Sequence, residues 1–416
     1  MVNIDVAVIG GGSAGMAAAL SAKENGVENI LILEQGNELG GILQQCIHNG
    51  FGLQVYNEEL TGPSFAQKLI DEVNNNNIDY RLETTVISIT KDKQITYVNE
   101  KEGYVSVKAK SIILACGCYE RNRGAISIPG VRVKGIYTAG EAQKLLNIEN
   151  ILVGKRVFIL GSGDIGLIMA RRMMLEGAKV LGVAEIMPYS NGLMRNIVQC
   201  LKDFDIPLYL SHIIIDVQGK EHVEKITIGK VDKKKKLIKG TEKDFWVDTL
   251  LLAVGLIPET SLTQTAGIQL DAHTKGPLVN DRFETTVPGI YACGNALHVH
   301  DLVDFVTMES KLVGRFVAED ILSYTTTPNL INVFPLEGVN YVLPQRLNKD
   351  VKEKVTFYFR VNKPYKESKV EFLDGDRVIK SVKKKYMLPA NMERITLKKD
   401  EINNISFDLK VRVSEI

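Results

Sequence analysis

Cysteine is scarce in this chain, and its spacing excludes most cysteine-based centres. The 416 residues include five cysteines, and no two of them stand in a C-x-x-C or C-x4-C arrangement. A redox-active disulfide of the usual spacing, an iron–sulfur cluster and a zinc framework are therefore not expected. Reduced thiols suit the cytoplasm, so we predict a cytoplasmic protein without a metal site. The cysteines are Cys46, Cys116, Cys118, Cys200 and Cys293.

The sequence also lacks a long apolar run and an excess of either charge. No stretch of about 18 apolar residues occurs, and an apolar strand begins by Ile4, so neither a membrane span nor a signal peptide is predicted. Lysine and arginine number 51 against 50 acidic residues, which argues against nucleic-acid binding. The basic run Lys233–Lys236 lies between apolar pairs, which is typical of a solvated hairpin turn.

What the sequence does contain is one glycine motif, present twice. G-x-G-x-x-G occurs at residues 10–15 after the apolar run 6–9, and again at residues 161–166 after the apolar run 157–160. The first glycine of such a motif permits a tight turn, and the second lets the backbone approach a pyrophosphate. The third lets the next helix lie close to the strand, with its first N–H groups facing the phosphates.

An acidic residue follows each motif at the same offset. Glu34 and Glu185 each stand 24 positions after the first glycine, at the end of a second apolar strand. A carboxylate there accepts hydrogen bonds from ribose and repels a 2′-phosphate, and no arginine stands at residues 186–192, so we expect NADH over NADPH. Two complete copies predict two bound dinucleotides and, as the leading hypothesis, hydride transfer. Incidental glycines in ordinary βαβ units, or a second site for another adenine nucleotide such as ATP, stay open as alternatives.

The remaining sequence alternates between helical and strand patterns up to about residue 330. Beyond that point short strands dominate, and they predict a small all-β domain of the sandwich type. The expected helices cover residues 13–25, 63–74, 164–176 and 303–324. The expected strands include residues 80–89, 94–99, 103–109, 111–115, 354–361, 369–373, 377–383 and 406–413.

Four blocks stand in the order found in the flavoproteins with two dinucleotide-binding domains, the group that includes glutathione and thioredoxin reductases. They are residues 10–15 with Glu34, 112–117, 161–166 with Glu185, and 286–295. The chain resembles this group over about 330 residues. The resemblance implies an α/β fold of two Rossmann-like domains, the second inserted in the first. The expected boundaries are 1–125 and 258–328 for an FAD-binding domain, 126–257 for an NAD-binding domain and 330–416 for the C-terminal β-sandwich-like domain.

The resemblance also implies which residues hold the two cofactors. FAD would lie along the first domain with its adenosine ribose on Glu34, and NAD(H) would lie on the second motif with its nicotinamide stacked on the flavin. The residues expected at FAD are Gly10, Gly12, Ser13, Ala14, Gly15, Glu34, Gln35, Gly40, Gly41, Ile42, Ala115, Gly117, Gly294 and Asn295. Those expected at NAD(H) are Gly161, Gly163, Asp164, Ile165, Gly166, Glu185 and Gly255.

Several departures from the group narrow the prediction. Asn295 replaces the usual acid of the last block, yet an amide can still accept and donate hydrogen bonds, so FAD binding should survive. The cysteine pair that follows the double glycine in the reductases is absent, which excludes a disulfide reductase. Residues 45–52 and 298–304 are similar to a subgroup of flavoprotein subunits of amine, opine, proline and cyanide-forming glycine dehydrogenases, and to the flavoprotein that accompanies bacterial glycerol-3-phosphate dehydrogenase. Longer relatives carry an iron–sulfur segment, but no cysteine follows Cys293 here.

Four residues are candidates for catalysis beside the flavin. Cys46 and His48 lie in a glycine-flanked loop, where a thiolate or an imidazole could poise the flavin or move a proton. His300 and Asp301 precede the helix expected at 303–324, whose N-terminus would favour an anionic reduced flavin. Packing of the loop and capping of the helix are the competing interpretations.

The sequence therefore predicts an FAD-dependent, NAD(H)-linked oxidoreductase, working as an electron-transfer subunit of a larger dehydrogenase. It would act on a small-molecule substrate or electron acceptor and assemble with a partner subunit or as a homo-oligomer. A self-sufficient NADH oxidase or dehydrogenase and a non-catalytic flavin-binding interaction protein are the alternatives. We expect the β tail to serve assembly; the alternative is that it covers an apolar face of the FAD domain.

Overall fold

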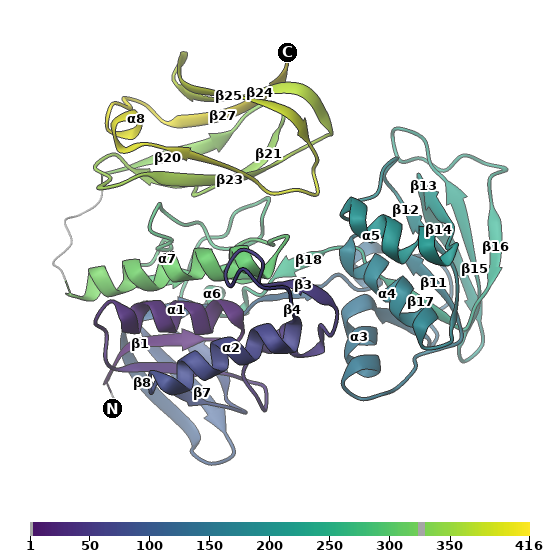
Figure 1. Cartoon of the computed structure of the whole chain (residues 1–416), viewed down its shortest axis with the longest axis horizontal. Coiled ribbons are helices and arrows are strands. Elements are labelled where there is room, and N and C mark those ends of the chain that lie inside the picture. Colours follow the sequence, from purple (N-terminus) through teal and green to yellow (C-terminus); the bar gives the residue numbers. More distant parts are fainter. Residues whose placement is uncertain (1–2, 323–328) are drawn as a thin grey trace. The chain divides into compact units, whose positions relative to one another are not determined.

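The computed structural model describes residues 3–322 and 329–416, and the chain forms two compact units (Figure 1). The first unit comprises Met1–Cys118 and Pro258–Ile416, and the second comprises Tyr119–Ile257. The second unit is thus inserted between two parts of the first, as the order of the sequence blocks predicts. In the described ranges, no helix combines the length and the apolar character that crossing a membrane requires.

A mainly parallel sheet forms the centre of the first unit. Its strand order is β5-β2-β1-β8-β7-β6. Strand β19 also pairs with β8, at residues 112–114. Strand β2 reads Ile-Leu-Ile-Leu and is buried at every position, as expected when both faces of a parallel sheet are covered. The strands are β1 (Asn3–Ile9), β2 (Ile30–Leu33), β5 (Asp79–Arg81), β6 (Thr85–Ile89), β7 (Gln94–Asn99), β8 (Gly103–Leu114) and β19 (Ile290–Ala292).

The predicted meander differs from the observed one in two places. The strand expected at 80–89 is split into β5 and β6, which pair with different neighbours. The strands expected at 103–109 and 111–115 are a single strand, β8, because its first half pairs with β7 and its second half with β1 and β19.

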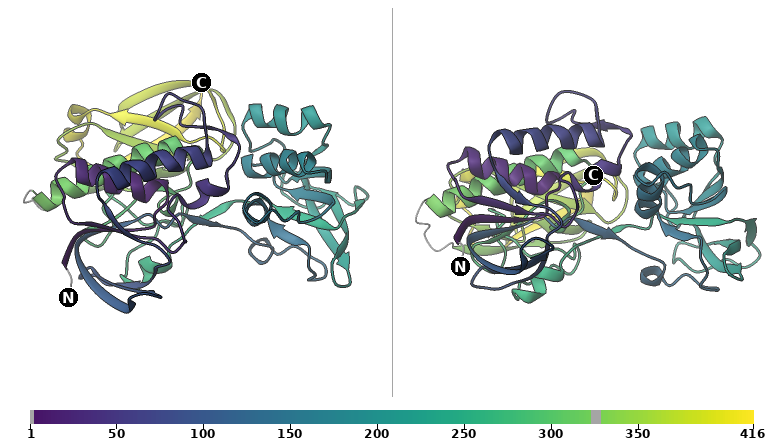
Figure 2. Two further views of the ribbon diagram at one scale, coloured as in Figure 1. Left: turned by 60° about the horizontal axis from the view of Figure 1, so that its bottom comes forward. Right: turned by 90° about the horizontal axis from the view of Figure 1, so that it is seen from below.

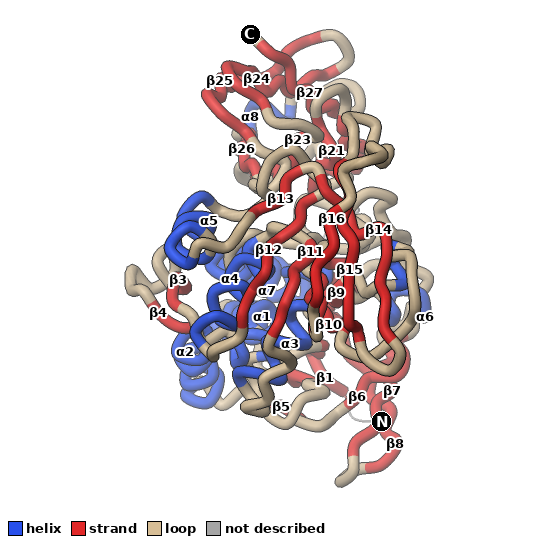
Figure 3. The backbone as a smooth tube through the Cα atoms, turned by 90° about the vertical axis from the view of Figure 1, so that its right-hand side faces the viewer, coloured by secondary structure: helices blue, strands red, loops and turns tan. Residues whose placement is uncertain are grey.

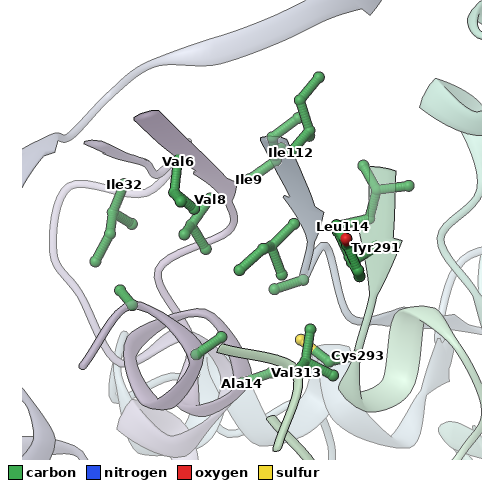
Figure 4. Close-up of a cluster of buried hydrophobic side chains, with 14 of the residues drawn as sticks. Val6, Val8, Ile9, Ala14, Ile32, Ile112, Leu114, Tyr291, Cys293 and Val313 are labelled. Carbon is green, nitrogen blue, oxygen red and sulfur yellow. The ribbon is translucent and has the colours of Figure 1, made fainter. Parts of the chain in front are cut away.

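Helices α1 (Ser13–Glu24) and α7 (Val303–Leu322) pack closely on this sheet. The close approach depends on Gly314, because a Cβ added there would overlap the carbonyl oxygen of Ala18. Figure 4 shows side chains of β1, β2, β8 and β19 with Ala14 of α1 and Val313 of α7 in the same core. Helix α2 (Gly62–Asn75) is capped by Thr61, whose hydroxyl accepts from the Ser64 N–H at 3.3 Å. The end expected for α7, Tyr324, lies outside the described residues.

The second unit contains a parallel sheet of order β10-β17-β11-β12-β13 and an antiparallel sheet of order β14-β15-β16 (Figure 3). The run at Lys233–Lys236 forms a turn, closed by the Asp232 N–H donating to the Lys236 carbonyl at 2.9 Å. The elements are β10 (Ile136–Thr138), α3 (Ala139–Asn147), β11 (Arg156–Leu160), α4 (Asp164–Leu175), β12 (Lys179–Glu185), α5 (Met194–Cys200), β13 (Leu208–Leu210), β14 (His212–Gly219), β15 (Val223–Lys230), β16 (Lys243–Trp246) and β17 (Thr249–Leu252).

Residues 330–416, called the tail below, form two further sheets (Figures 1 and 2). Their orders are β22-β20-β27-β24-β25 and β21-β23-β26, and Phe357, Phe359 and Phe372 are fully buried in the tail core. The all-β prediction is confirmed, although β20, β21, β22, β26 and the short α8 are additional to the expected elements. The elements are β20 (Leu330–Pro335), β21 (Val339–Leu343), β22 (Arg346–Asn348), β23 (Val355–Val361), β24 (Tyr365–Asp374), β25 (Arg377–Met387), β26 (Glu393–Leu397), α8 (Lys399–Asn403) and β27 (Leu409–Glu415).

The tail also packs against the rest of the first unit. Leu343 and Tyr358 belong to the same buried cluster as the side chains of β1 and β8. This packing favours the alternative in which the tail covers an apolar face. Short elements complete the fold: β3 (Asn49–Phe51), β4 (Leu60–Thr61), β9 (Cys118–Glu120), β18 (Leu256–Pro258), α6 (Ser261–Thr265), and the 3-10 turns η1 (Gly41–Gln45), η2 (Gly124–Ile126), η3 (Lys202–Phe204) and η4 (Gly294–Ala296).

Candidate dinucleotide sites

The first glycine motif forms the turn between β1 and α1. Gly10 has φ +107°, and a Cβ there would overlap the Ala115 carbonyl oxygen at the end of β8. A Cβ on Gly15 would overlap the Gly10 carbonyl oxygen, which explains why α1 can lie so close to β1. The middle glycine is different, because a Cβ on Gly12 would meet no atom of the described residues within 4 Å. The motif is therefore closed against the protein at its ends and open at its centre.

The second motif repeats this geometry between β11 and α4. Gly161 has φ +104°, and a Cβ there would overlap the Ala253 carbonyl oxygen; a Cβ on Gly166 would overlap that of Gly161. The middle glycine, Gly163, again faces no described atom within 4 Å. Within the described chain, neither α1 nor α4 has a side-chain cap on its first N–H groups. Both turns thus offer open backbone N–H groups where a diphosphate would need them.

The two acids occupy equivalent places at the ends of β2 and β12, and both are buried. Glu34 accepts from the Gly11 N–H through Oε2 and from the Gly36 N–H through Oε1, each at 2.6 Å. Glu185 accepts the Ser162 N–H at 3.0 Å and the Ser162 hydroxyl at 2.7 Å through Oε2. Its Oε1 accepts the Met187 N–H at 2.9 Å. Because a carboxylate oxygen accepts about two hydrogen bonds, Glu34 keeps capacity on both oxygens and Glu185 only on Oε1.

Asp164 stands in the first turn of α4, where a helix attracts negative charge. Its Oδ1 accepts from the Leu193 N–H at 2.8 Å and from the Asn196 amide at 2.6 Å. The side chain therefore fastens the start of α5 to α4. Helix α1 has no acid in its first turn.

The double glycine and the last block both lie against the first motif. The Gly40 N–H donates to the Gly11 carbonyl at 2.9 Å, and a Cβ on Gly41 would be 3.2 Å from the Gly12 Cα. A Cβ on Gly294 would be 2.8 Å from the Ala14 Cβ. The structure thus brings together four segments that are far apart in the sequence, around the open face of Gly12. Of the other residues expected at FAD, Gln35 and Ile42 are exposed, Ser13 is partly exposed and Gly117 has φ +74°. Of those expected at NAD(H), Ile165 is partly exposed and Gly255 has φ +105°.

Asn295, which stands where the group usually has an acid, uses both halves of its amide. Its oxygen accepts from the His300 N–H at 3.0 Å, and its Nδ2 donates to the Cys118 sulfur at 3.6 Å. A carboxylate could not donate to that sulfur. The amide therefore joins the last block to Cys118 at the start of β9 and to the loop before α7.

The structure does not support a thiolate at Cys46. The sulfur donates to the Ile42 carbonyl at 3.3 Å, and burial raises the pKa of the Cys46 thiol to about 12. Burial therefore favours the neutral thiol over the predicted thiolate near neutral pH, and a role for Cys46 beside the flavin stays a prediction. His48, two residues further on, packs against Phe51 with ring centroids 5.0 Å apart.

His300 lies in a buried cluster with His298 and Glu309. Glu309 Oε2 is 2.8 Å from His298 Nε2 and 3.2 Å from His300 Nε2, and Glu309 Oε1 accepts from the Gly294 N–H at 2.9 Å. Burial alone would raise the pKa of Glu309, but the two imidazoles hold that pKa below its usual range. Sequence analysis does not find Glu309, because helix α7 contains several acids and nothing in the sequence marks this one as buried beside the two histidines.

Asp301 is engaged by the tail and is not free to move a proton. One carboxylate oxygen forms an ion pair with Arg360 of β23, and the other accepts from the Met392 N–H at 2.6 Å. Arg360 also donates to the Val299 carbonyl at 3.0 Å. The proposed catalytic role for Asp301 is therefore replaced by a positioning role, since it holds the loop before α7 against the tail. Arg360 could not be predicted because it lies 59 residues away, in the tail.

Asp304, in the first turn of α7, fixes a second loop. Its two oxygens accept from the Gly52 N–H at 3.1 Å, the Gln54 N–H at 2.8 Å and the Val55 N–H at 3.1 Å. The N-terminus of α7 is thus fastened on one side to the loop that follows Cys46 and His48, and on the other side to the tail.

Residues 4–311 match the model of the pyridine nucleotide-disulphide oxidoreductase family. The chain therefore belongs to this family, whose members use FAD and NAD(P)H as oxidoreductases. The predicted resemblance is confirmed at this level.

Individual relatives are more distant. An opine oxidase subunit of Agrobacterium tumefaciens is 26% identical over 312 residues, which cover 70% of this chain and 61% of that protein. The hydrogen cyanide synthase subunit HcnB of Pseudomonas protegens is 24% identical over 317 residues, which cover 70% and 66%. This chain thus spans less than two thirds of the length of the first and about two thirds of the second.

Solved structures agree on the fold. Thioredoxin reductase of T. acidophilum superposes with a TM-score of 0.63 at 24% identity, covering 78% of this chain and 100% of that one. The predicted fold class, two Rossmann-like domains with an additional strand-rich C-terminal domain, is confirmed.

Proposed function

We propose that the protein transfers hydride between NAD(H) and FAD and passes electrons to or from a partner, as the flavoprotein subunit of a larger dehydrogenase. The single observation that carries this proposal is the paired geometry of the two motifs. In each motif the outer glycines are closed by backbone oxygens and the middle glycine is open. In each unit a buried acid at the end of the next strand accepts a hydrogen bond from a backbone N–H of the motif.

The first site fits FAD on its own residues. The open space at Gly12 would receive a diphosphate, and the Glu34 carboxylate would accept from the adenosine ribose. Gly41, Ala14 and Gly294 border the same space. Bound FAD would supply the hydride-accepting ring, while these residues bind and orient it. FMN lacks the adenosine, so with FMN bound Glu34 would have no ribose hydroxyl to accept from.

The second site fits NAD(H) better than its 2′-phosphorylated form. Gly163 is open in the same way as Gly12, and Glu185 would accept from the adenosine ribose through Oε1. Its negative charge disfavours a 2′-phosphate. A second adenine nucleotide bound only structurally remains the competing candidate, because it would satisfy the same acceptor.

The subunit role rests on the names of the two relatives, both of which are called subunits. It also rests on the five cysteines, which all lie in the described ranges, form no disulfide there and include no pair of redox-disulfide spacing. A partner would therefore supply the remaining redox step. The partner's chemistry is a proposal at the level of an electron donor or acceptor.

An anaerobic titration tests the proposal. The protein with its flavin is mixed with NADH or NADPH, and the flavin absorbance is followed. We expect stoichiometric bleaching by NADH and a slower reaction with NADPH. Faster bleaching by NADPH would contradict the role of Glu185, and an inert flavin would contradict the enzyme. In a separate aerobic assay, rapid consumption of oxygen after NADH addition would favour a self-sufficient oxidase.

A matched pair of variants assigns the two sites. A methyl group at Gly12 or Gly163 meets no described protein atom within 4 Å, so both variants should fold. Gly12→Ala should lose FAD, whereas Gly163→Ala should keep FAD and lose bleaching by NADH. If Gly163→Ala is bleached as fast as the wild type, NADH does not use the second motif.

A further inference from the structure

The cluster of His298, His300 and Glu309 lies in the interior of the first unit. Its two histidines stand in the loop before α7, and Glu309 belongs to α7 itself. The side chains are 1%, 2% and 0% exposed. On the tail side, the rings of Tyr341 and Tyr358 lie 6.5 and 5.6 Å from that of His298. Three polar side chains are thus enclosed between the helix and the tail.

The hydrogen-bond partners of His300 require a further proton or a metal ion in the cluster. Its Nδ1 is 3.0 Å from the His298 carbonyl oxygen, which can only accept, so Nδ1 must carry a hydrogen. A neutral imidazole then has a bare lone pair on Nε2. That nitrogen is 3.2 Å from Glu309 Oε2, which also has only lone pairs to offer. Two lone pairs at this distance repel each other unless a second proton or a metal ion lies between them.

The three ligand atoms are arranged for a shared ion. Each of the three residues offers one ligand atom within 4.8 Å of those of the other two, and Glu309 Oε2 is 2.8 Å from His298 Nε2 and 3.2 Å from His300 Nε2. The groups behind two of the three ligands are also fixed: His300 Nδ1 faces a backbone carbonyl, and Glu309 Oε1 accepts from the Gly294 N–H. Metal-binding histidines usually donate their other N–H to a carbonyl in this way, which fixes the ring and its tautomer. Behind the third ligand, His298 Nδ1 is buried without a hydrogen-bond partner among the described residues.

We propose that this cluster binds one Zn²⁺ through His298 Nε2, His300 Nε2 and Glu309 Oε2. Two histidines and one carboxylate are a known zinc ligand set, with a water in the fourth position. Zinc suits this site because it has no redox chemistry and no geometric preference of its own. The sequence alone carries no such signal, since the ligands are spaced at 298, 300 and 309 and include no cysteine.

A zinc ion here would act as a brace and would not touch the flavin chemistry directly. Through Glu309 it would connect α7 to the Gly294 N–H of the last block, and through the histidines it would connect α7 to the loop held by the tail. Removal of the ion should therefore loosen the place where three segments of the first unit meet.

The first test uses the full-length wild-type protein grown with zinc. Metal is measured by plasma mass spectrometry and flavin by absorbance, so that both are known per chain. We expect about one zinc per chain after gel filtration in metal-free buffer. After stripping with a chelator, Co²⁺ should restore the metal and give the visible d–d absorption of a tetrahedral site, and the melting temperature should rise on reloading.

Variants locate the ion. Glu309→Gln and His300→Gln should each reduce the zinc content to about a tenth or less, because each leaves only two protein ligands for the ion. His273→Ala, at an exposed histidine elsewhere in the first unit, is the control and should keep the full content. Circular dichroism identifies any variant that fails to fold, and the wild-type zinc and cobalt measurements stand without the variants.

Two results would overturn the proposal. A zinc-grown wild type that contains no metal and gives no Co²⁺ spectrum would mean that a proton is the cation in the cluster. Full zinc content in folded Glu309→Gln and His300→Gln would place the metal elsewhere. Because neither measurement uses NADH, a failure here is distinguishable from a failure of the proposed oxidoreductase activity.

Discussion

The two glycine motifs have the same backbone geometry but different surroundings. Helix α1 begins without an acid, and Glu34 accepts from backbone N–H groups. Helix α4 begins with Asp164, and Ser162 takes both acceptor positions of one Glu185 oxygen. An acid at a helix N-terminus repels a phosphate that the helix dipole alone would attract. We therefore expect tighter binding at the motif of the first unit and weaker, exchangeable binding at that of the second.

The first site also has additional walls around its motif. The double glycine at residues 40–41 and the last block at residues 294–295 both lie against the first motif. The N-terminus of α7 is held by Asp304 on one side and through Asp301 by the tail on the other. The first motif is therefore the more enclosed of the two, which is what the proposal of a resident FAD requires.

The largest effects are expected from the third glycines. In Gly15→Ala and Gly166→Ala the new methyl group overlaps a carbonyl oxygen, which should cost about 3 kcal/mol of unfolding free energy or more. Gly15→Ala should be recovered without flavin, whereas Gly166→Ala should keep FAD in a destabilised second unit. Flavin content and urea unfolding measure both. A stable Gly15→Ala protein with full FAD would contradict the packing of α1 on β1.

The next effect concerns the tail, which holds the loop before α7 through Arg360. Arg360→Ala leaves the Asp301 carboxylate, which is mostly buried, without its ion pair, and this should cost about 3 kcal/mol. The midpoint of flavin release in urea should fall with that of unfolding. The control is Lys363→Ala at the exposed pair with Glu415, where we expect little or no change in stability. Equal effects of the two variants would mean that the tail does not hold the loop.

A smaller effect should make the second site more like the first. Asp164→Asn removes the charge from the first turn of α4 while an amide oxygen can still accept from Leu193 and Asn196. NADH binding should tighten by about 0.3–1 kcal/mol, which is about two- to five-fold in Kd. Fluorescence titration measures it, with Glu176→Gln at the other end of α4 as the control. Weaker binding in Asp164→Asn would contradict the comparison.

The smallest effect tests Cys46, which follows the double glycine of the first site. Its pKa is raised to about 12 by burial, so at about pH 8 only about one thiol in ten thousand is a thiolate. Alkylation by iodoacetamide should be much slower than that of free glutathione and should increase with pH over the range in which the protein stays folded. Peptide mass spectrometry measures it. Rapid modification at about pH 7 would restore the thiolate hypothesis.

The features that depend on local pattern can be predicted from the sequence. The two motifs with Glu34 and Glu185 specify the parallel sheets, and the order of four blocks predicts the inserted unit. These predictions are possible because a turn that needs glycine and a strand that needs apolar residues leave a mark on consecutive positions.

The features that depend on distant contacts cannot be predicted in this way. Asp301 is a candidate for catalysis in the sequence because nothing near it indicates Arg360 or Met392. Cys46 is a candidate for reactivity in the sequence because its burial, which raises the pKa of the thiol, becomes visible only in the folded chain. Glu309, one of several acids in helix α7, becomes a candidate ligand only when the fold places His298 and His300 beside it.

The inserted topology also has a consequence for how the chain is made. The second unit is complete in sequence at Ile257, whereas the sheet of the first unit still lacks β19 (Ile290–Ala292) and its partner helix α7. Domains fold as units during synthesis, at about 5–20 residues per second. On the ribosome the nucleotide unit at residues 119–257 can therefore fold first, while the edge of β8 that β19 will cover stays unpaired. Early binding of a nucleotide would stabilise only the second unit, and the flavin site can form only when the chain has been synthesised past α7.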